Sequence, residues 1–197
     1  MTLGDPLLPM AAFAFATSAT PGPVNILSAM SGARFGIISS LPYVLGATAS
    51  FVAMLLLIGF GFRSFIELIE AFSRPIALIG AAYLLYLAYK IAADRGDLNF
   101  DGSKAIRPSF ITGALTQAVN PKAWIVSLSA ISLYVGPYTD HVFRLTAFSA
   151  IFFAICATSL AGWVVVGSYF ARFSGNVALF NRAMAVLLVA SVIPMVI

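Results

Sequence analysis

Six long apolar stretches account for most of this chain and limit what it can fold into. Each is roughly 20 residues long, which is the length that a helix needs to cross the hydrocarbon core of a bilayer. Charged residues make up only 9% of the sequence and the mean hydropathy is +0.99, whereas soluble domains are about 25% charged. We therefore expect an all-α integral membrane protein with six spans, at residues 7–30, 37–62, 75–93, 109–135, 143–170 and 177–197.

Two of these stretches contain residues that interrupt helices. The first holds Thr20-Pro21-Gly22-Pro23-Val24-Asn25, where two prolines remove backbone donors and a glycine loosens the chain between them. The fourth holds Asn120-Pro121-Lys122. A lysine near the centre of a membrane helix costs about 2.5 to 3.5 kcal/mol on insertion scales. We therefore expect both helices to break here, and Lys122 to face a polar cavity rather than lipid.

The two interruptions occupy corresponding positions in the two halves of the chain. Residues 1–93 and 108–197 each hold three spans, and the polar stretch 94–107 is predicted to be a cytoplasmic linker between them. Because each half has an odd number of spans, the halves must insert in opposite orientations. Paired interrupted helices in inverted repeats indicate the central binding site of a secondary transporter. We predict one membrane domain built from two inverted three-helix repeats, with helices 1 and 4 broken.

Basic residues are unevenly divided between the two sides of the predicted membrane. Seven lie in or beside the first, third and fifth loops, and three lie on the opposite side. The positive-inside rule then places the odd-numbered loops in the cytoplasm and both termini on the periplasmic face. The more basic side holds Arg34, Lys90, Arg95, Lys104, Arg107, Arg172 and Arg182, and the other side holds Arg63, Arg74 and Arg144.

The residue types around the interruptions suit a zwitterion. Backbone amides and Lys122 suit a carboxylate, whereas carbonyls and the side chains of Asn25 and Asn120 suit an ammonium group. Thr112, Thr116 and Asn120 recur at intervals of four, which predicts one polar helix face leading to Lys122. The predicted substrate-binding residues are Pro21, Gly22, Pro23, Asn25, Thr116, Gln117, Asn120, Pro121 and Lys122.

Other classes of function fit these residues less well. As an intramembrane enzyme, the chain would use Lys122 to activate Ser127 or Ser129, but their spacing from Lys122 places them off its helix face or two turns along it. Efflux of inorganic cations or other small solutes is a further alternative, although the spans hold no Asp, Glu or His side chain and only one Cys, too few of the ligands that metals need. With a single cysteine, Cys156, and no cluster of basic and aromatic residues, we expect no metal, no cofactor and no nucleic-acid partner.

Three motifs resemble those of the lysine exporter (LysE) superfamily, most closely its RhtB-type exporters of homoserine, threonine and neutral amino acids in bacteria. The resemblance covers essentially the whole chain, in its length and six-span layout as well as its motifs. It implies an inner-membrane exporter that moves amino acids or related metabolites outward, driven by the proton gradient, and that forms a homodimer among membrane lipids. The motifs are 20–25, Gly80-Ala81-Ala82-Tyr83-Leu84-Leu85-Tyr86-Leu87 and Phe110-Ile111-Thr112-Gly113-Ala114-Leu115-Thr116-Gln117-Ala118-Val119-Asn120-Pro121-Lys122.

The chain departs from the family pattern in the second span. Many relatives carry an acidic residue after a glycine there, where this chain reads Gly46-Ala47-Thr48-Ala49-Ser50-Phe51. The resemblance therefore names no proton-coupling carboxylate, and uniport or exchange are alternatives to proton coupling. Without a carboxylate to hold a second positive charge, the predicted cavity favours a small neutral amino acid over a dibasic one. The small polar side chains expected there are Asn25, Ser28, Thr112 and Thr116.

Overall fold

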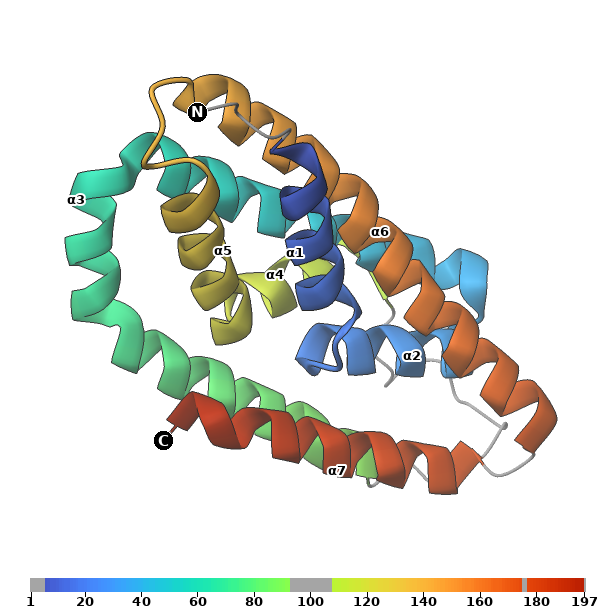
Figure 1. The fold of residues 1–197 in the computed structure, drawn as a ribbon. Coiled ribbons are helices and arrows are strands. Elements are labelled where there is room, and N and C mark those ends of the chain that lie inside the picture. The colour runs from blue at the N-terminus through green and yellow to red at the C-terminus, as the bar shows by residue number, and fades with distance from the viewer. Residues whose placement is uncertain (1–5, 93–107, 175–176, 197) are drawn as a thin grey trace.

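The computed structural model describes residues 6–92, 108–174 and 177–196, and these residues are helical with no strand among them. The predicted linker 94–107 lies outside the described residues. The expectation of an all-α protein is confirmed. The helices are α1 (Leu7–Ala19), α2 (Pro23–Phe35), α3 (Ile37–Ala92), α4 (Phe110–Ala118), α5 (Pro121–Tyr134), α6 (His141–Ser174) and α7 (Val177–Val196), shown in Figure 1.

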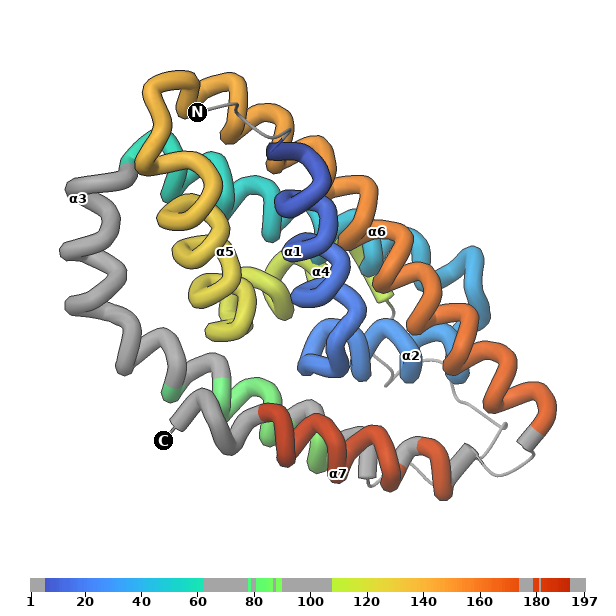
Figure 2. Tube along the Cα trace, viewed as in Figure 1, coloured from blue at the N-terminus to red at the C-terminus, as the bar shows by residue number. Residues whose placement is uncertain are grey.

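Two uninterrupted helical stretches support the broken ones. Both α1 and α2 pack on α6, whereas α4 and α5 pack on α3. The main hydrophobic core lies between them, and its largest fully buried side chains include Phe148, Phe152 and Leu55. Figure 2 follows the chain through α1 and α2 and through α4 and α5, whose two breaks both lie in the middle of the molecule. The fold therefore brings the two interrupted segments together inside a frame of continuous helices.

Helix α3 covers two of the predicted spans, 37–62 and 75–93. Its helical segment runs from Ile37 to Ala92 with a kink, at which only Gly61 departs from helical angles, with φ −100° and ψ 15°. This single departure changes the direction of the chain without ending the helical segment. Figure 1 shows α3 turning back so that its last part lies along α7.

Two helical stretches among the described residues are long and apolar enough to cross a bilayer without interruption: Ile37–Gly61 and His141–Phe173. The first and fourth predicted spans do not reach that length as single helices, because each is divided at its break. Their parts contain 13 residues in α1, 13 in α2, 9 in α4 and 14 in α5. Interrupted helices of this kind occur in membranes only where the freed backbone groups find partners inside the protein.

Glycines allow very close approach at two helix crossings. A methyl group on Gly167 of α6 would lie 1.7 Å from the carbonyl oxygen of Ala29 in α2, and one on Gly32 of α2 would lie 2.0 Å from that of Val164. The crossing of α3 and α4 has the same reciprocal arrangement, through Gly46 and Gly113, each against the other helix's backbone. Small residues permit such approach, and close packing is the main attraction between membrane helices. These two crossings fix the broken helices on α3 and α6.

A buried ion pair lies in the turn before α6. The Arg144 side chain is buried, with its Nε 2.7 Å from the Asp140 carboxylate and its guanidinium 3.7 Å from the centre of the Tyr138 ring. A planar guanidinium can pair with a carboxylate and stack on an aromatic ring at the same time. The Arg144 side chain therefore stabilises this turn at the start of α6.

Candidate functional site

Both predicted helix breaks are present, and each is followed by a proline that starts the next helix. The first break separates Ala19 from Pro23, with Gly22 extended at φ −161° and ψ 174°. The second separates Ala118 from Pro121. Proline is well suited to the first turn of a helix, because its missing amide would have no partner there and its φ is already helical. The prolines that prevent the first helix from continuing are therefore also suited to begin the next one.

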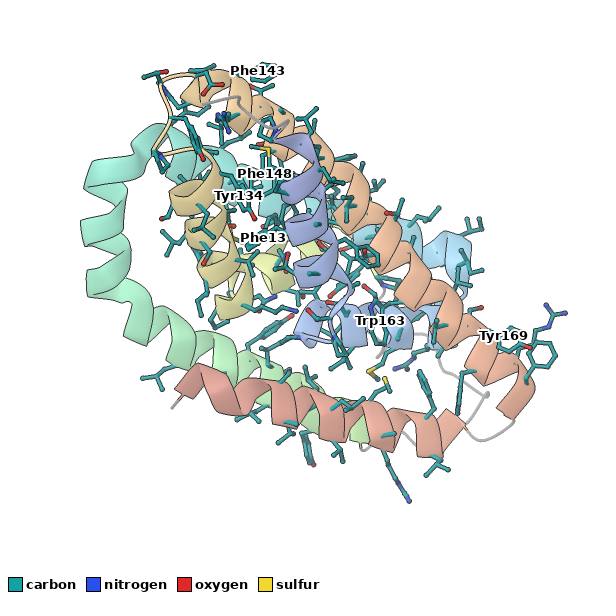
Figure 3. All side chains as sticks on the ribbon, viewed as in Figure 1. Phe13, Tyr134, Phe143, Phe148, Trp163 and Tyr169 are labelled. Carbon is teal, nitrogen blue, oxygen red and sulfur yellow. The ribbon has the colours of Figure 1, made fainter. Side chains whose placement is uncertain are left out.

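The two tryptophans of the chain bind the carbonyl groups that the breaks release. Trp163 Nε1 in α6 donates to the carbonyl oxygen of Ala19 at 3.3 Å, and Trp124 Nε1 in α5 donates to that of Ala118 at 2.8 Å. Ala19 and Ala118 are the last residues of α1 and α4. Figure 3 shows Trp163 on α6 beside the end of α1. Sequence reasoning missed both residues. Trp163 is far from Ala19 in the chain, and Trp124 bonds back across a break whose geometry the sequence does not give.

The Asn25 amide and the Lys122 ammonium group bind the polar groups at the first break. Asn25 Nδ2 donates to the carbonyl oxygen of Ser18 at 2.7 Å. Lys122 Nζ donates to the carbonyl oxygen and to the hydroxyl of Thr20, at 3.1 and 2.8 Å. A methyl group on Gly22 would lie 3.3 Å from both Lys122 Nζ and Cδ, so glycine leaves the room that this side chain occupies. Lys122 therefore joins the second break directly to the first.

Asn120 organises the second break. Its Oδ1 accepts a hydrogen bond from the backbone amide of Lys122 at 3.2 Å, which caps α5, and its Nδ2 donates to Gln117 Oε1 at 3.1 Å. The prediction that Thr112, Thr116 and Asn120 share one helix face is wrong for Asn120, because α4 ends at Ala118 before that residue is reached. Thr112 instead forms a capping box with Ser109 at the start of α4.

A small cavity lies where the two breaks meet. Its volume is about 30 Å³, which is room for about two water molecules. This volume is smaller than that of an amino acid. The wall consists of Thr17, Ser18, Val24, Asn25, Phe51, Gln117, Asn120, Lys122, Ala123, Val126, Phe152, Cys156 and Leu160.

The cavity contains some of the predicted site residues and excludes others. Asn25, Gln117, Asn120 and Lys122 line it, and Gly22 lies against Lys122. Six residues considered for the site lie outside its wall. Pro21 is exposed, Thr112 belongs to the capping box of α4, and Pro23, Ser28, Thr116 and Pro121 are buried elsewhere. The Ser28 and Thr116 hydroxyls bind backbone carbonyls of their own helices. Sequence reasoning missed Phe51 and Phe152, which lie at similar distances along the chain from Pro21 and Pro121.

The wall of the cavity can form several kinds of polar contact. Lys122 supplies the one charged side chain among the residues that line it, and Asn25, Asn120 and Gln117 supply amides. Its helix termini differ in polarity, since α2 and α5 begin here and α1 and α4 end here. Helix N-termini favour anionic groups and C-termini favour cationic ones. Within the described residues, no group of three His, Cys, Asp or Glu side chains is placed to hold a metal ion.

We expect Trp163→Phe to lower the thermal stability of the protein. The change keeps an aromatic ring but leaves the Ala19 carbonyl without its indole donor. A buried polar group without a partner costs about 1–3 kcal/mol, so thermal unfolding in detergent should begin several degrees lower. The matched control is Tyr169→Phe, which removes an exposed hydroxyl from the same helix. Equal unfolding temperatures for the Trp163→Phe variant and the wild type would contradict this role.

Two interrupted helices that meet at a central cavity are the arrangement of secondary transporters, and comparison with known proteins agrees. The chain belongs to the LysE type translocator family, whose model matches residues 15–197. It is therefore a transporter rather than an enzyme. It is 32% identical over 157 residues to the cysteine/O-acetylserine efflux protein of Klebsiella pneumoniae, covering 79% of each chain. The protein of the same name from Escherichia coli strain K12 is 31% identical over the same length and coverage. No solved structure matches significantly.

These comparisons confirm the resemblance to the LysE superfamily that the sequence motifs indicated. They also agree with amino-acid export as the general activity of the relatives, since the relatives are named as efflux proteins for amino-acid compounds. The narrower assignment to RhtB-type exporters stays a prediction. LysE-type exporters are inner-membrane proteins, which is consistent with the two long apolar helices described above.

Proposed function

We propose that this protein exports small neutral amino acids or closely related metabolites across the bacterial inner membrane. The observation that carries the proposal is the cavity between the two helix breaks, where Lys122 of one break reaches Thr20 of the other. A carboxylate entering this site can pair with Lys122, and an ammonium group can bind the carbonyls at the end of α1. The relatives named as cysteine/O-acetylserine efflux proteins have substrates with both groups.

The membrane arrangement that accompanies this function has six spans in two inverted repeats, residues 1–93 and 108–197, joined by a cytoplasmic linker at 94–107. The division of basic residues supports this orientation, with both termini in the periplasm. In this arrangement α1 with α2 forms the first span and α4 with α5 forms the fourth.

Proton coupling and assembly as a homodimer belong to the same proposal. A small neutral substrate follows from the cavity wall, which carries a lysine and no carboxylate.

The test is efflux from proteoliposomes preloaded with a mixture of amino acids, with and without an imposed pH gradient. We expect selective efflux of small neutral amino acids, such as cysteine, serine and threonine, and faster efflux when the gradient drives protons inward. Lysine is included as a competing substrate, and its preferential export would overturn the neutral class. Equal rates with and without the gradient would overturn proton coupling, and the absence of selective efflux would overturn amino-acid export itself.

A further inference from the structure

The wall of the cavity is divided by helix type. The interrupted segments supply its amides, its ammonium group and the smaller apolar side chains of Val24, Ala123 and Val126. The continuous helices α3 and α6 supply the larger apolar side chains Phe51, Phe152 and Leu160 and the thiol of Cys156. A zwitterion binds through its charged groups at the breaks if the proposed function is correct. The side chain of that substrate must then face the wall formed by α3 and α6. The groups on this wall, together with Ser18 in the last turn of α1, which also lines the cavity, are the ones in position to distinguish one amino acid from another.

Two stacked phenylalanines form the rigid part of this wall. The Phe51 and Phe152 rings lie 4.1 Å apart at an angle of 14°, and the two residues are 3% and 1% exposed. Phe148 packs against Phe152 at 5.8 Å and is itself 5.3 Å from Tyr134 and 6.2 Å from Phe13. Figure 3 shows Phe13, Tyr134 and Phe148 gathered between α1, α5 and α6. Neither stacked ring can turn aside for a larger substrate without disturbing this cluster.

One hydroxyl group in the cavity wall has no hydrogen-bond partner within the described part of the chain. Ser18, in the last turn of α1, is 8% exposed and lines the cavity, and its Oγ is unpaired. Its backbone carbonyl is already bound by Asn25, so the hydroxyl is a separate polar group. The Cys156 thiol of the same wall is a weak acceptor, and it already accepts a hydrogen bond from the Thr48 hydroxyl at 3.8 Å. A buried hydroxyl without a partner is unfavourable unless a ligand or a water supplies one.

We propose that Phe51, Phe152 and Ser18 form a side-chain subsite that selects amino acids with a short side chain ending in a hydroxyl or a thiol. The two rings limit the length of the side chain, and Ser18 Oγ pairs with its terminal group. This inference rests on the proposed function and assigns the selectivity of that same site to three residues. A pocket that offers a hydrogen bond rejects a substrate lacking the matching group, because its own polar atom is then left unpaired.

Competition in the proteoliposome assay tests the ring pair. Phe152→Ala should raise the rate of leucine or methionine export relative to serine by tenfold or more, since a hydrophobic pocket distinguishes substrates by roughly 10–200-fold per methylene. The matched control is Phe180→Ala, which removes a buried ring that packs on Phe170 and lies outside both the cavity wall and the cluster around Phe152. Its leucine-to-serine ratio should equal that of the wild type. Phe152→Leu, which keeps an apolar side chain, provides a second variant if Phe152→Ala does not fold, and should shift the ratio in the same direction.

Ser18→Ala tests the hydroxyl independently. The wild type should prefer serine to alanine, and the variant should reduce that preference by about tenfold, the value of one lost hydrogen bond of about 1.4 kcal/mol. In Ser18→Ala, the leucine-to-serine ratio should change only through the slower export of serine. Equal losses for all amino acids in the Phe152 variants, or an unchanged serine-to-alanine ratio in Ser18→Ala, would overturn the subsite. Wild-type vesicles that export no amino acid would instead overturn the proposed function. The export rate of the wild type is therefore measured before that of any variant.

Discussion

Replacing Lys122 by methionine is expected to reduce amino-acid export by about 10- to 100-fold. Lys122 is the charged group of the cavity and the direct link between the two breaks, through the carbonyl and the hydroxyl of Thr20. Methionine keeps an unbranched apolar stem but removes the ammonium group. Hydrogen bonds to charged groups contribute about 1.5–3 kcal/mol, and each 1.4 kcal/mol corresponds to a factor of ten. The measurement is the initial rate of efflux from preloaded proteoliposomes.

Two comparisons separate a loss of binding from a loss of folding. Lys122→Arg retains the positive charge, although the space beside Gly22 is narrow, and it should export at a rate between those of the wild type and Lys122→Met. Thr20→Val removes one of the two groups that Lys122 binds and leaves the carbonyl, so it should have a smaller effect than Lys122→Met. Export at the full rate by a folded Lys122→Met protein would place the binding site elsewhere.

Gly167→Ala is expected to destabilise the protein more than any other single methyl addition considered for α6. The added carbon would lie 1.7 Å from the Ala29 carbonyl oxygen, and a backbone atom cannot move aside as the end of a side chain can. The crossing of α2 and α6 must therefore separate, which disturbs α2 and the break that precedes it. Overpacking of this kind costs about 1–3 kcal/mol and sometimes more. Thermal unfolding in detergent and the yield of monodisperse protein measure the effect.

The matched control is Gly162→Ala on the same helix, where a methyl group would meet nothing within 4 Å. It should unfold at or slightly above the temperature of the wild type, because alanine favours helix more than glycine does. Gly32→Ala makes the reciprocal contact with Val164 and should behave like Gly167→Ala. Similar stability for the Gly167 and Gly162 variants would mean that the two helices are not as close as the structure indicates.

Local sequence was sufficient to locate the helix breaks. Proline restricts its own φ and lacks an amide, and its clustering with glycine at 20–25 and with asparagine at 120–122 predicted two interruptions, both of which are present. A single proline was not sufficient, since Pro75 lies within α3 without ending it. The boundary expected near residue 62 coincides with the change of direction at Gly61, whereas the polar stripe was wrongly extended across a break to Asn120.

The sequence by itself determined that this chain is an all-α member of a translocator family, with two interrupted helices and a lysine between them. Those properties depend on composition, on proline chemistry and on motifs that are contiguous in the chain. Only the tertiary structure decided what surrounds the breaks: Trp163 and Trp124 on the freed carbonyls, Phe51 stacked on Phe152, and the Ser18 hydroxyl left unpaired. Most of these contacts join helices far apart in the chain. An almost uniformly apolar helix carries little periodic signal to indicate which side faces its neighbour, so only packing of the helices against one another could decide them.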